Sequence, residues 1–174
     1  MKATGVVRRI DELGRIVIPK EIRRTLKIKE GTPLEIYSGD NGELYLKKYS
    51  PVLEISSLAD EIVNCINECT YLNVLITNME KVIASSGKDK SQYINKQIDS
   101  QIERLIRARQ TQIVSCLENA SLFFSDGVKY FVISPIMTAG DVYGSIIISA
   151  DSGLGDAEKL VAKTFANYLG KQIG

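Results

Sequence analysis

The chain has 174 residues, of which 44% are hydrophobic and 25% are charged, a composition typical of a soluble protein with one or two folded domains. It contains no histidine, which excludes the Ser-His-Asp and Cys-His nucleophile systems and the HExxH metalloproteases, because each needs an imidazole. No run approaches the roughly 18 to 20 apolar residues of a membrane span, and the N-terminus has no secretory signal pattern, so we expect no membrane segment and a cytoplasmic protein.

Three cysteines are present and no two of them form a CxxC pair. We expect Cys65 and Cys69 to be reduced, partly buried thiols of a helix. A metal could bind them only with further ligands, and without histidine we predict no metal site.

The formal net charge of +1 hides an uneven distribution along the chain. Residues 1–50 hold 11 Lys and Arg against 7 Asp and Glu, a net charge of +4, which leaves 11 against 14, or −3, for residues 51–174. A basic part favours a polyanionic partner, although a merely solvated surface is the alternative. Because Pro51 interrupts the strand pattern, we expect two domains, 1–52 and 53–174.

The basic part begins with two strand candidates, TGVVRRI and RIVI, joined by the turn residues DELG, in which Gly14 can take a positive φ. Pro19 suits the first turn of a helix, so we expect a helix from about Pro19 to Leu26. At 100° per residue its cations share one face, opposite an apolar face. These cations are Lys20, Arg23, Arg24 and Lys27.

The segments PLEIY and ELYLK alternate around SGDNG and predict a hairpin. One side of this hairpin is apolar and needs a cover: Leu34, Ile36, Leu44 and Leu46. About 50 residues bury little surface alone, so we expect a homodimer through this domain. Two-fold symmetry doubles the cationic face, which suits a DNA duplex.

The stretch MKATGVVRRIDELGRIVIPKEIRRTLKIKEGTPLEIY resembles, over its whole length, the N-terminal domain of the AbrB family of bacterial transition-state regulators. The resemblance implies a swapped-hairpin dimer in which strands of two chains interleave into an all-β-rich barrel with one short helix, and double-stranded DNA as the partner. It implies primary DNA contacts by Arg8, Arg15, Arg23 and Arg24, with Lys2, Arg9, Lys20 and Lys27 as secondary candidates. Asp11 and Glu12 lie in the same loop, and we expect them to pair with neighbouring arginines and set the loop's shape.

Residues 53–174 predict an α+β domain with helices on one face of an antiparallel sheet. A helix to Cys69 comes first, followed by a strand pair around residues 79–81 and a helix at about 98–109. Three strands and a helix from Asp156 follow, with a tight TAGD turn between the last two strands.

The fragment SPIMTAGDVYGSIIIS and the order of elements resemble a GAF domain, the small-molecule sensor fold. The resemblance implies an unidentified small-molecule ligand between the sheet and its covering segments, near Ser85, Phe123, Phe124 and Tyr130. Residues of these types are more often core or surface than ligand contacts, and we predict no other cofactor. The two end helices either pack on their own sheet or build helical bundles between copies, which would give a homotetramer.

Together, the two domains resemble a sporulation regulator of a spore-forming Firmicute. This implies activation and repression of late genes in the forespore, and no enzyme activity. The alternative is an antitoxin with the same DNA-binding fold. Antitoxin tails are short and largely disordered, however, whereas residues 53–174 predict a folded domain.

Overall fold

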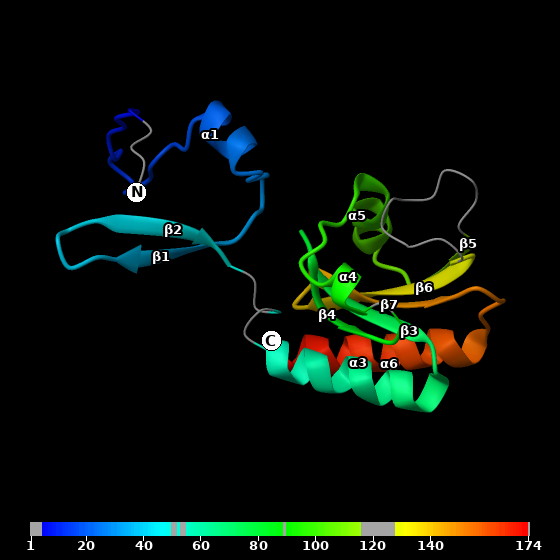
Figure 1. The fold of residues 1–174 in the computed structure, drawn as a ribbon. Helices are drawn as coiled ribbons and strands as arrows, with labels where there is room; N and C mark the ends of the chain where they lie inside the picture. The colour runs from blue at the N-terminus through cyan, green and yellow to red at the C-terminus, as the bar shows by residue number, and fades with distance from the viewer. Residues whose placement is uncertain (1–4, 50–51, 53–54, 89, 116–127, 174) are drawn as a thin grey trace. The chain divides into compact units, whose positions relative to one another are not determined.

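The computed structural model describes residues 5–49, 52, 55–88, 90–115 and 128–173 (Figure 1). The chain divides into two compact units, Met1–Tyr49 and Ser50–Gly174, called here the head and the body.

The head contains one short helix, α1 (Lys20–Thr25), and an antiparallel hairpin of β1 (Leu34–Ser38) and β2 (Leu44–Lys48). The hairpin was predicted and is confirmed. Its register places Ile36 opposite Leu46 and Ser38 opposite Leu44. Residues directly opposite in an antiparallel pair share a face, so the predicted apolar side exists.

Helix α1 begins one residue later than expected. Pro19 has a ψ of 149° and precedes the helix as its N-cap, so Lys20 is the first helical residue. At the other end Lys27 takes a left-handed φ of 52°, and the Ile28 N–H donates to the Arg23 carbonyl at 2.7 Å. This is the bond pattern of a Schellman motif, which ends the helix.

The strands expected at about 4–10 and 15–18 are not formed within one chain, so this prediction is wrong for the single chain. The described residues of these segments lie outside regular structure, on either side of a turn at Asp11–Arg15. A strand requires a neighbour to pair with, and β1 and β2 pair with each other. Gly14 in the turn has a φ of 74°, as predicted.

The body is built on a five-stranded antiparallel sheet in the order β4-β3-β7-β6-β5 (Figure 1). Its strands are β3 (Asn73–Asn78), β4 (Val82–Ser86), β5 (Gln112–Ser115), β6 (Tyr130–Thr138) and β7 (Asp141–Ala150). Its helices are α3 (Ser56–Thr70), α4 (Lys90–Tyr93), α5 (Ser100–Arg107) and α6 (Asp156–Gln172). The predicted antiparallel sheet flanked by helices is confirmed, and the short α4 lies between the strand pair and the helix that were expected.

Helices cover both faces of this sheet, which corrects the expectation of one covered face. Val74, Ile146 and Ile148 pack in the cluster that contains residues of α3 and α6. Leu75 and Ile147 pack in a second cluster, with Ile102 and Ile106 of α5. The sequence carried this signal, because β6 and β7 are continuous apolar runs rather than alternating ones, as expected for strands buried on both sides.

The two cysteines of α3 are exposed, so their expected burial was wrong. The buried positions of α3 are Ala59, Ile62, Val63 and Ile66, and Cys65 and Cys69 lie outside that set. Among the described residues, no helix combines the length and the apolar character that crossing a membrane would require.

A close backbone contact between β7 and β3 requires glycine at position 144. A Cβ built on Gly144 would lie 1.9 Å from the carbonyl oxygen of Thr77, whereas nothing lies within 4 Å of the corresponding position at Gly153. The close pairing of β3 and β7 therefore requires a residue without a Cβ at position 144.

We expect Gly144→Ala to destabilise the body by about 2 to 3 kcal/mol, because a backbone carbonyl cannot move aside as a flexible side chain can. Urea unfolding followed by circular dichroism measures the change. Gly153→Ala is the matched control and should stay within about 0.5 kcal/mol of the wild type. Equal stability of the two variants would contradict the close contact.

Candidate nucleic-acid interface

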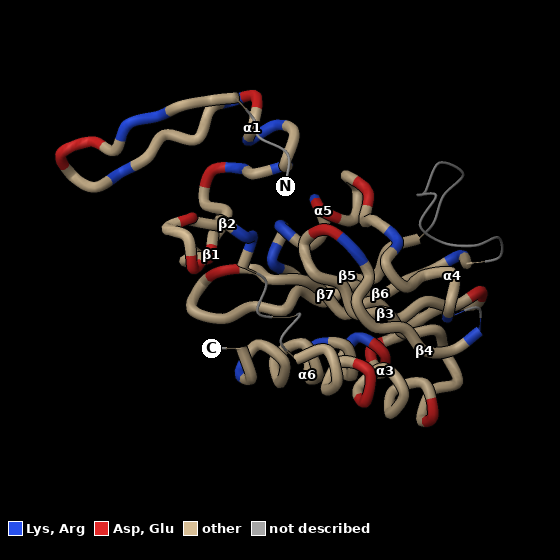
Figure 2. Tube along the Cα trace, turned by 60° about the vertical axis from the view of Figure 1, so that its left-hand side comes forward, with Lys and Arg blue, Asp and Glu red and all other residues tan. Residues whose placement is uncertain are grey.

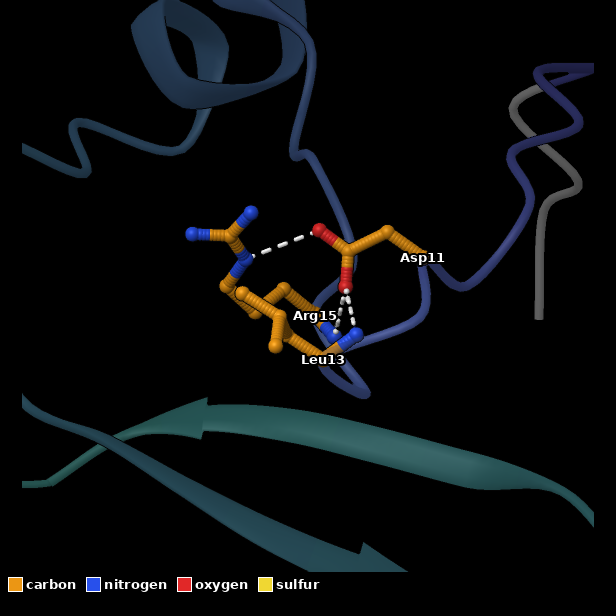
Figure 3. Close-up of polar contacts among 3 residues, drawn as sticks. All are labelled: Asp11, Leu13 and Arg15. Carbon is orange, nitrogen blue, oxygen red and sulfur yellow. Dashed lines mark hydrogen bonds and ion pairs between the residues drawn. The ribbon is translucent and has the colours of Figure 1, made fainter.

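The loop between Asp11 and Arg15 is held by a single carboxylate (Figure 3). One oxygen of Asp11, Oδ1, accepts the backbone N–H of Leu13 at 3.0 Å and that of Arg15 at 2.8 Å. The other, Oδ2, accepts the side-chain Nε–H of Arg15 at 2.8 Å. The backbone closes the same turn, since the Asp11 N–H donates to the Arg15 carbonyl at 3.0 Å.

These contacts favour the ionised form of Asp11. The backbone N–H of Arg15, and then its guanidinium, lower the pKa of Asp11 below its ordinary value, against a smaller opposing effect of desolvation. The expectation that Asp11 pairs with a neighbouring arginine is confirmed for Arg15. Glu12 is exposed, and no such contact is seen for it among the described residues.

The predicted DNA-binding side chains of the head lie at the surface. Arg8 and Arg9 precede the loop and are exposed, and the Arg15 side chain is 70% exposed. On α1 and at its end, all four predicted cations are exposed: Lys20, Arg23, Arg24 and Lys27. Figure 2 shows cationic positions both around the loop and on α1. Lys2 lies outside the described residues.

The described residues of the head form no buried core. None of the described residues in the range 5–49 is buried. On the apolar face of the hairpin Ile36 is 66%, Leu44 71% and Leu46 46% exposed. A hairpin of this kind is marginal alone and needs a further layer, so the exposed cations belong to a unit that one chain leaves incomplete.

Two of the residues predicted for a ligand site in the body, Ser85 and Tyr130, do not come together. Ser85 pairs with Leu75, whose cluster lies on the α4/α5 side, whereas Tyr130 lies two residues before Val132, which packs on the α3/α6 side. Side chains two apart on a strand share a face, so Ser85 and Tyr130 lie on opposite faces of the sheet. Phe123 and Phe124 lie outside the described residues.

Ser85 itself has an unusual environment. The residue is 8% exposed, and its Oγ has no hydrogen-bond partner among the described residues. Buried hydroxyls are normally paired, so this one needs an explanation. No sequence signal distinguishes it from Ser86, whose hydroxyl donates to Asn64 at 2.8 Å.

Comparison with known families matches both units. Residues 54–174 match the family model described as stage V sporulation protein T C-terminal, transcription factor. Residues 7–54 match the model described as antidote-toxin recognition MazE, bacterial antitoxin.

Two relatives from Bacillus subtilis (strain 168) extend these matches. The chain is 41% identical to stage V sporulation protein T over 176 residues, which cover 99% of each chain. It is 61% identical to the transition state regulatory protein AbrB over 51 residues, which are 29% of this chain and 52% of that relative. The predicted resemblance of the head is thereby confirmed.

Solved structures identify the fold of the body. One is the GAF domain of an Acinetobacter phosphoenolpyruvate-protein phosphotransferase, with a TM-score of 0.58 and 12% identity, covering 68% of this chain and 81% of that one. Another is the cofactor-binding GAF domain of the nutrient sensor CodY from Clostridium difficile, with a TM-score of 0.52 and 17% identity, covering 66% and 83%. At these identities the likeness shows the fold alone, and it confirms the predicted GAF-like domain.

We expect Leu44→Asn to expose the hairpin to solvent exchange if a second layer covers its apolar face. Losing a buried leucine costs about 1.5 to 3 kcal/mol, so the opening of β1 and β2 should rise roughly 10- to 100-fold. Hydrogen exchange of the β1 and β2 amides in the full chain measures this. Glu35→Gln, on the opposite face of the hairpin, is the control and should leave protection unchanged; unchanged protection in Leu44→Asn would contradict a covered face.

Proposed function

The chain belongs to the stage V sporulation protein T family of transcription factors, and on this premise we propose that it binds double-stranded DNA through the loop and α1 of a dimeric head. Arg8, Arg15, Arg23 and Arg24 make the primary contacts. Lys2, Arg9, Lys20 and Lys27 are secondary candidates.

The observation that carries this proposal is the coincidence of two properties in one unit. The head exposes its cations on a loop and on the helix that follows it, and its described residues contain no buried core. A second copy that covers the hairpin supplies the core and presents the cations twice, related by two-fold symmetry. A duplex offers phosphates at a matching repeat, whereas a small anion does not.

The contacts are expected to be mainly to phosphates. Arginine guanidinium groups bind phosphate oxygens in a bidentate manner, and such contacts set register and orientation rather than sequence. Sequence preference then comes largely from the shape and deformability of the DNA.

The regulatory role follows from the family. The relative that is 41% identical over nearly the whole chain is a stage V sporulation protein, and this chain is a sporulation regulator of the same family. We place it in the cytoplasm of the forespore, where it activates some late genes and represses others. We assign no catalysis to the body, because the likeness to a methionine sulfoxide reductase, at 12% identity, concerns the fold alone.

The antitoxin alternative has one observation in its favour, the match of residues 7–54 to an antitoxin model. The body weighs against it, because residues 54–174 match a transcription factor model and fold around a five-stranded sheet. Co-purification of a small toxin with the full chain would restore this alternative.

The body is proposed to join two head dimers into a homotetramer. The outer surface of α6 carries Leu160, which is 65% exposed, and Tyr168, which is 45% exposed, and α3 carries two exposed cysteines. Exposed apolar residues and free cysteines on two neighbouring helices suit a helical bundle between copies.

The body is also proposed to bind a small molecule on the α4/α5 side of its sheet. The supporting observation is the buried, unpartnered hydroxyl of Ser85 on that side. A ligand with a polar group that meets this hydroxyl, on a floor that includes Leu75, would satisfy it. Tyr130 faces the other side and is no longer proposed as a neighbour of Ser85.

Substitution of the head arginines tests the DNA contacts. We expect Arg8→Ala/Arg23→Ala to weaken binding and to lower the salt slope by about 0.9 for each lost phosphate contact. Binding titrations at several salt concentrations measure both. Arg104→Ala/Arg109→Ala removes the same charge from exposed positions of the body and should leave the slope unchanged. Equal effects of the two pairs would contradict the assignment to the head.

Native mass spectrometry of the purified full chain tests the body. We expect the mass of four chains, plus an added small-molecule mass that Ser85→Ala removes because this substitution deletes the hydroxyl without adding atoms. Two chains at micromolar concentration would contradict the tetramer. Identical spectra for the wild type and Ser85→Ala, with no added mass, would contradict the ligand.

A further inference from the structure

The DNA-binding loop contains a carboxylate, whose charge has the wrong sign for that task. A carboxylate beside a phosphate raises the energy of the complex, and the same loop holds both Asp11 and Glu12. Asp11 differs from Glu12 because the loop's own donors occupy both of its oxygens.

We propose that Asp11 is a positioning residue for DNA binding: it holds Arg15 through Nε so that the two terminal nitrogens, Nη1 and Nη2, are directed to a phosphate. This rests on the proposed contact between Arg15 and DNA.

Asp11 holds Arg15 at both ends of its side chain. The Arg15 backbone N–H donates to Oδ1 at 2.8 Å, and the guanidinium Nε–H donates to Oδ2 at 2.8 Å. The aliphatic part of the Arg15 side chain therefore lies between two nitrogens that are both hydrogen-bonded to the Asp11 carboxylate. Figure 3 shows the Nε of Arg15 joined to a carboxylate oxygen of Asp11 by a dashed line, and no such line reaches the terminal nitrogens.

This arrangement leaves the donors that recognise phosphate available. A guanidinium has five N–H groups, and Nε supplies one of them. Among the described residues, no contact is seen for Nη1 or Nη2 of Arg15, and the side chain is 70% exposed. Because the Arg15 side chain is already oriented before DNA binds, it loses less conformational entropy on association.

Asp11 also shapes the backbone that carries the arginine. Its Oδ1 accepts the Leu13 N–H at 3.0 Å, its carbonyl accepts the Gly14 N–H at 2.9 Å, and Gly14 takes a positive φ of 74°. Loop shape and guanidinium orientation thus depend on one residue, which an experiment must separate.

Glu12 provides a matched control. It is adjacent, exposed and of the same charge, and it has no contact of this kind among the described residues. Asp11→Asn and Glu12→Gln each remove one negative charge per chain from the same loop. If charge alone matters, both variants bind DNA more tightly.

The proposal predicts opposite signs for these two variants. In Asp11→Asn the amide oxygen can still accept the backbone N–H groups, but the NH₂ group cannot accept Nε–H. We expect binding to DNA to weaken about 3- to 10-fold, with the salt slope reduced by about 2 per dimer, one phosphate contact per chain. Glu12→Gln should bind as tightly as the wild type or more tightly, with the slope unchanged. Tighter binding by both variants would overturn the proposal.

Arg15→Ala separates this inference from the proposed function. We expect it to weaken binding, and Asp11→Asn should cause no further weakening in the Arg15→Ala background, because a positioning residue acts through the side chain it positions. Further weakening there assigns Asp11 to loop shape alone and overturns the proposal. Unchanged binding by Arg15→Ala would overturn both the proposed Arg15 contact and the role of Asp11. If Arg15→Ala weakens binding but Asp11→Asn tightens it, the Arg15 contact stands and only the role of Asp11 is overturned.

An NMR measurement on the wild-type protein tests the proposal without relying on the folding of any variant. A hydrogen-bonded Nε–H exchanges slowly with water, so we expect the Arg15 Nε–H resonance to persist in the NMR spectrum of the full chain bound to DNA. Loss of that resonance on binding would show that Asp11 releases Arg15, and would overturn the proposal.

Discussion

The uncovered apolar face of the β1–β2 hairpin constrains the rest of the head. Ile36, Leu44 and Leu46 line one side of a two-stranded sheet that no other described part of the head covers, and more than 40% of each residue is exposed to solvent. Such a face is stable only when another apolar surface covers it. The segments on either side of the loop have no strand partner among the described residues of the head.

Dimerisation and DNA binding are therefore linked by one physical requirement. In the proposed dimer a second copy completes the head, and that copy brings a second set of arginines. The two-fold axis that completes the core also sets the spacing of the cations. In this arrangement the affinity for DNA depends on protein concentration, because the binding surface and the folded head form together.

The local chemistry of the loop shows why a net positive surface contains acids. Asp11 satisfies two backbone N–H groups and one side-chain N–H, so its charge is matched within the loop. In the body, buried hydroxyl groups pair with each other: Thr77 and Ser145 form a hydrogen bond across neighbouring strands at 2.8 Å. Ser85 departs from this pattern of local satisfaction, and it does so on the side of the sheet where a ligand is proposed.

Much of this protein was predictable from residue types and spacing. The hairpin, α1, the turn at Gly14 and the order of helices and strands in the body follow from local patterns, such as alternation, helical periodicity and the placing of glycine and proline. The exposed cations of the head were also predictable, because arginine and lysine rarely lie buried.

The tertiary structure decided what local patterns leave open. Continuous apolar strands are compatible with one or two covered faces, and only the packing of α5 shows that there are two. Whether Ser85 and Tyr130 share a face depends on strand register, in which a shift of one residue reverses every side chain. The pairing of both Asp11 oxygens depends on the closed turn. By itself the sequence determined which residues are charged, apolar or conformationally free, since these are properties of single side chains; which of them meet is a property of the folded backbone.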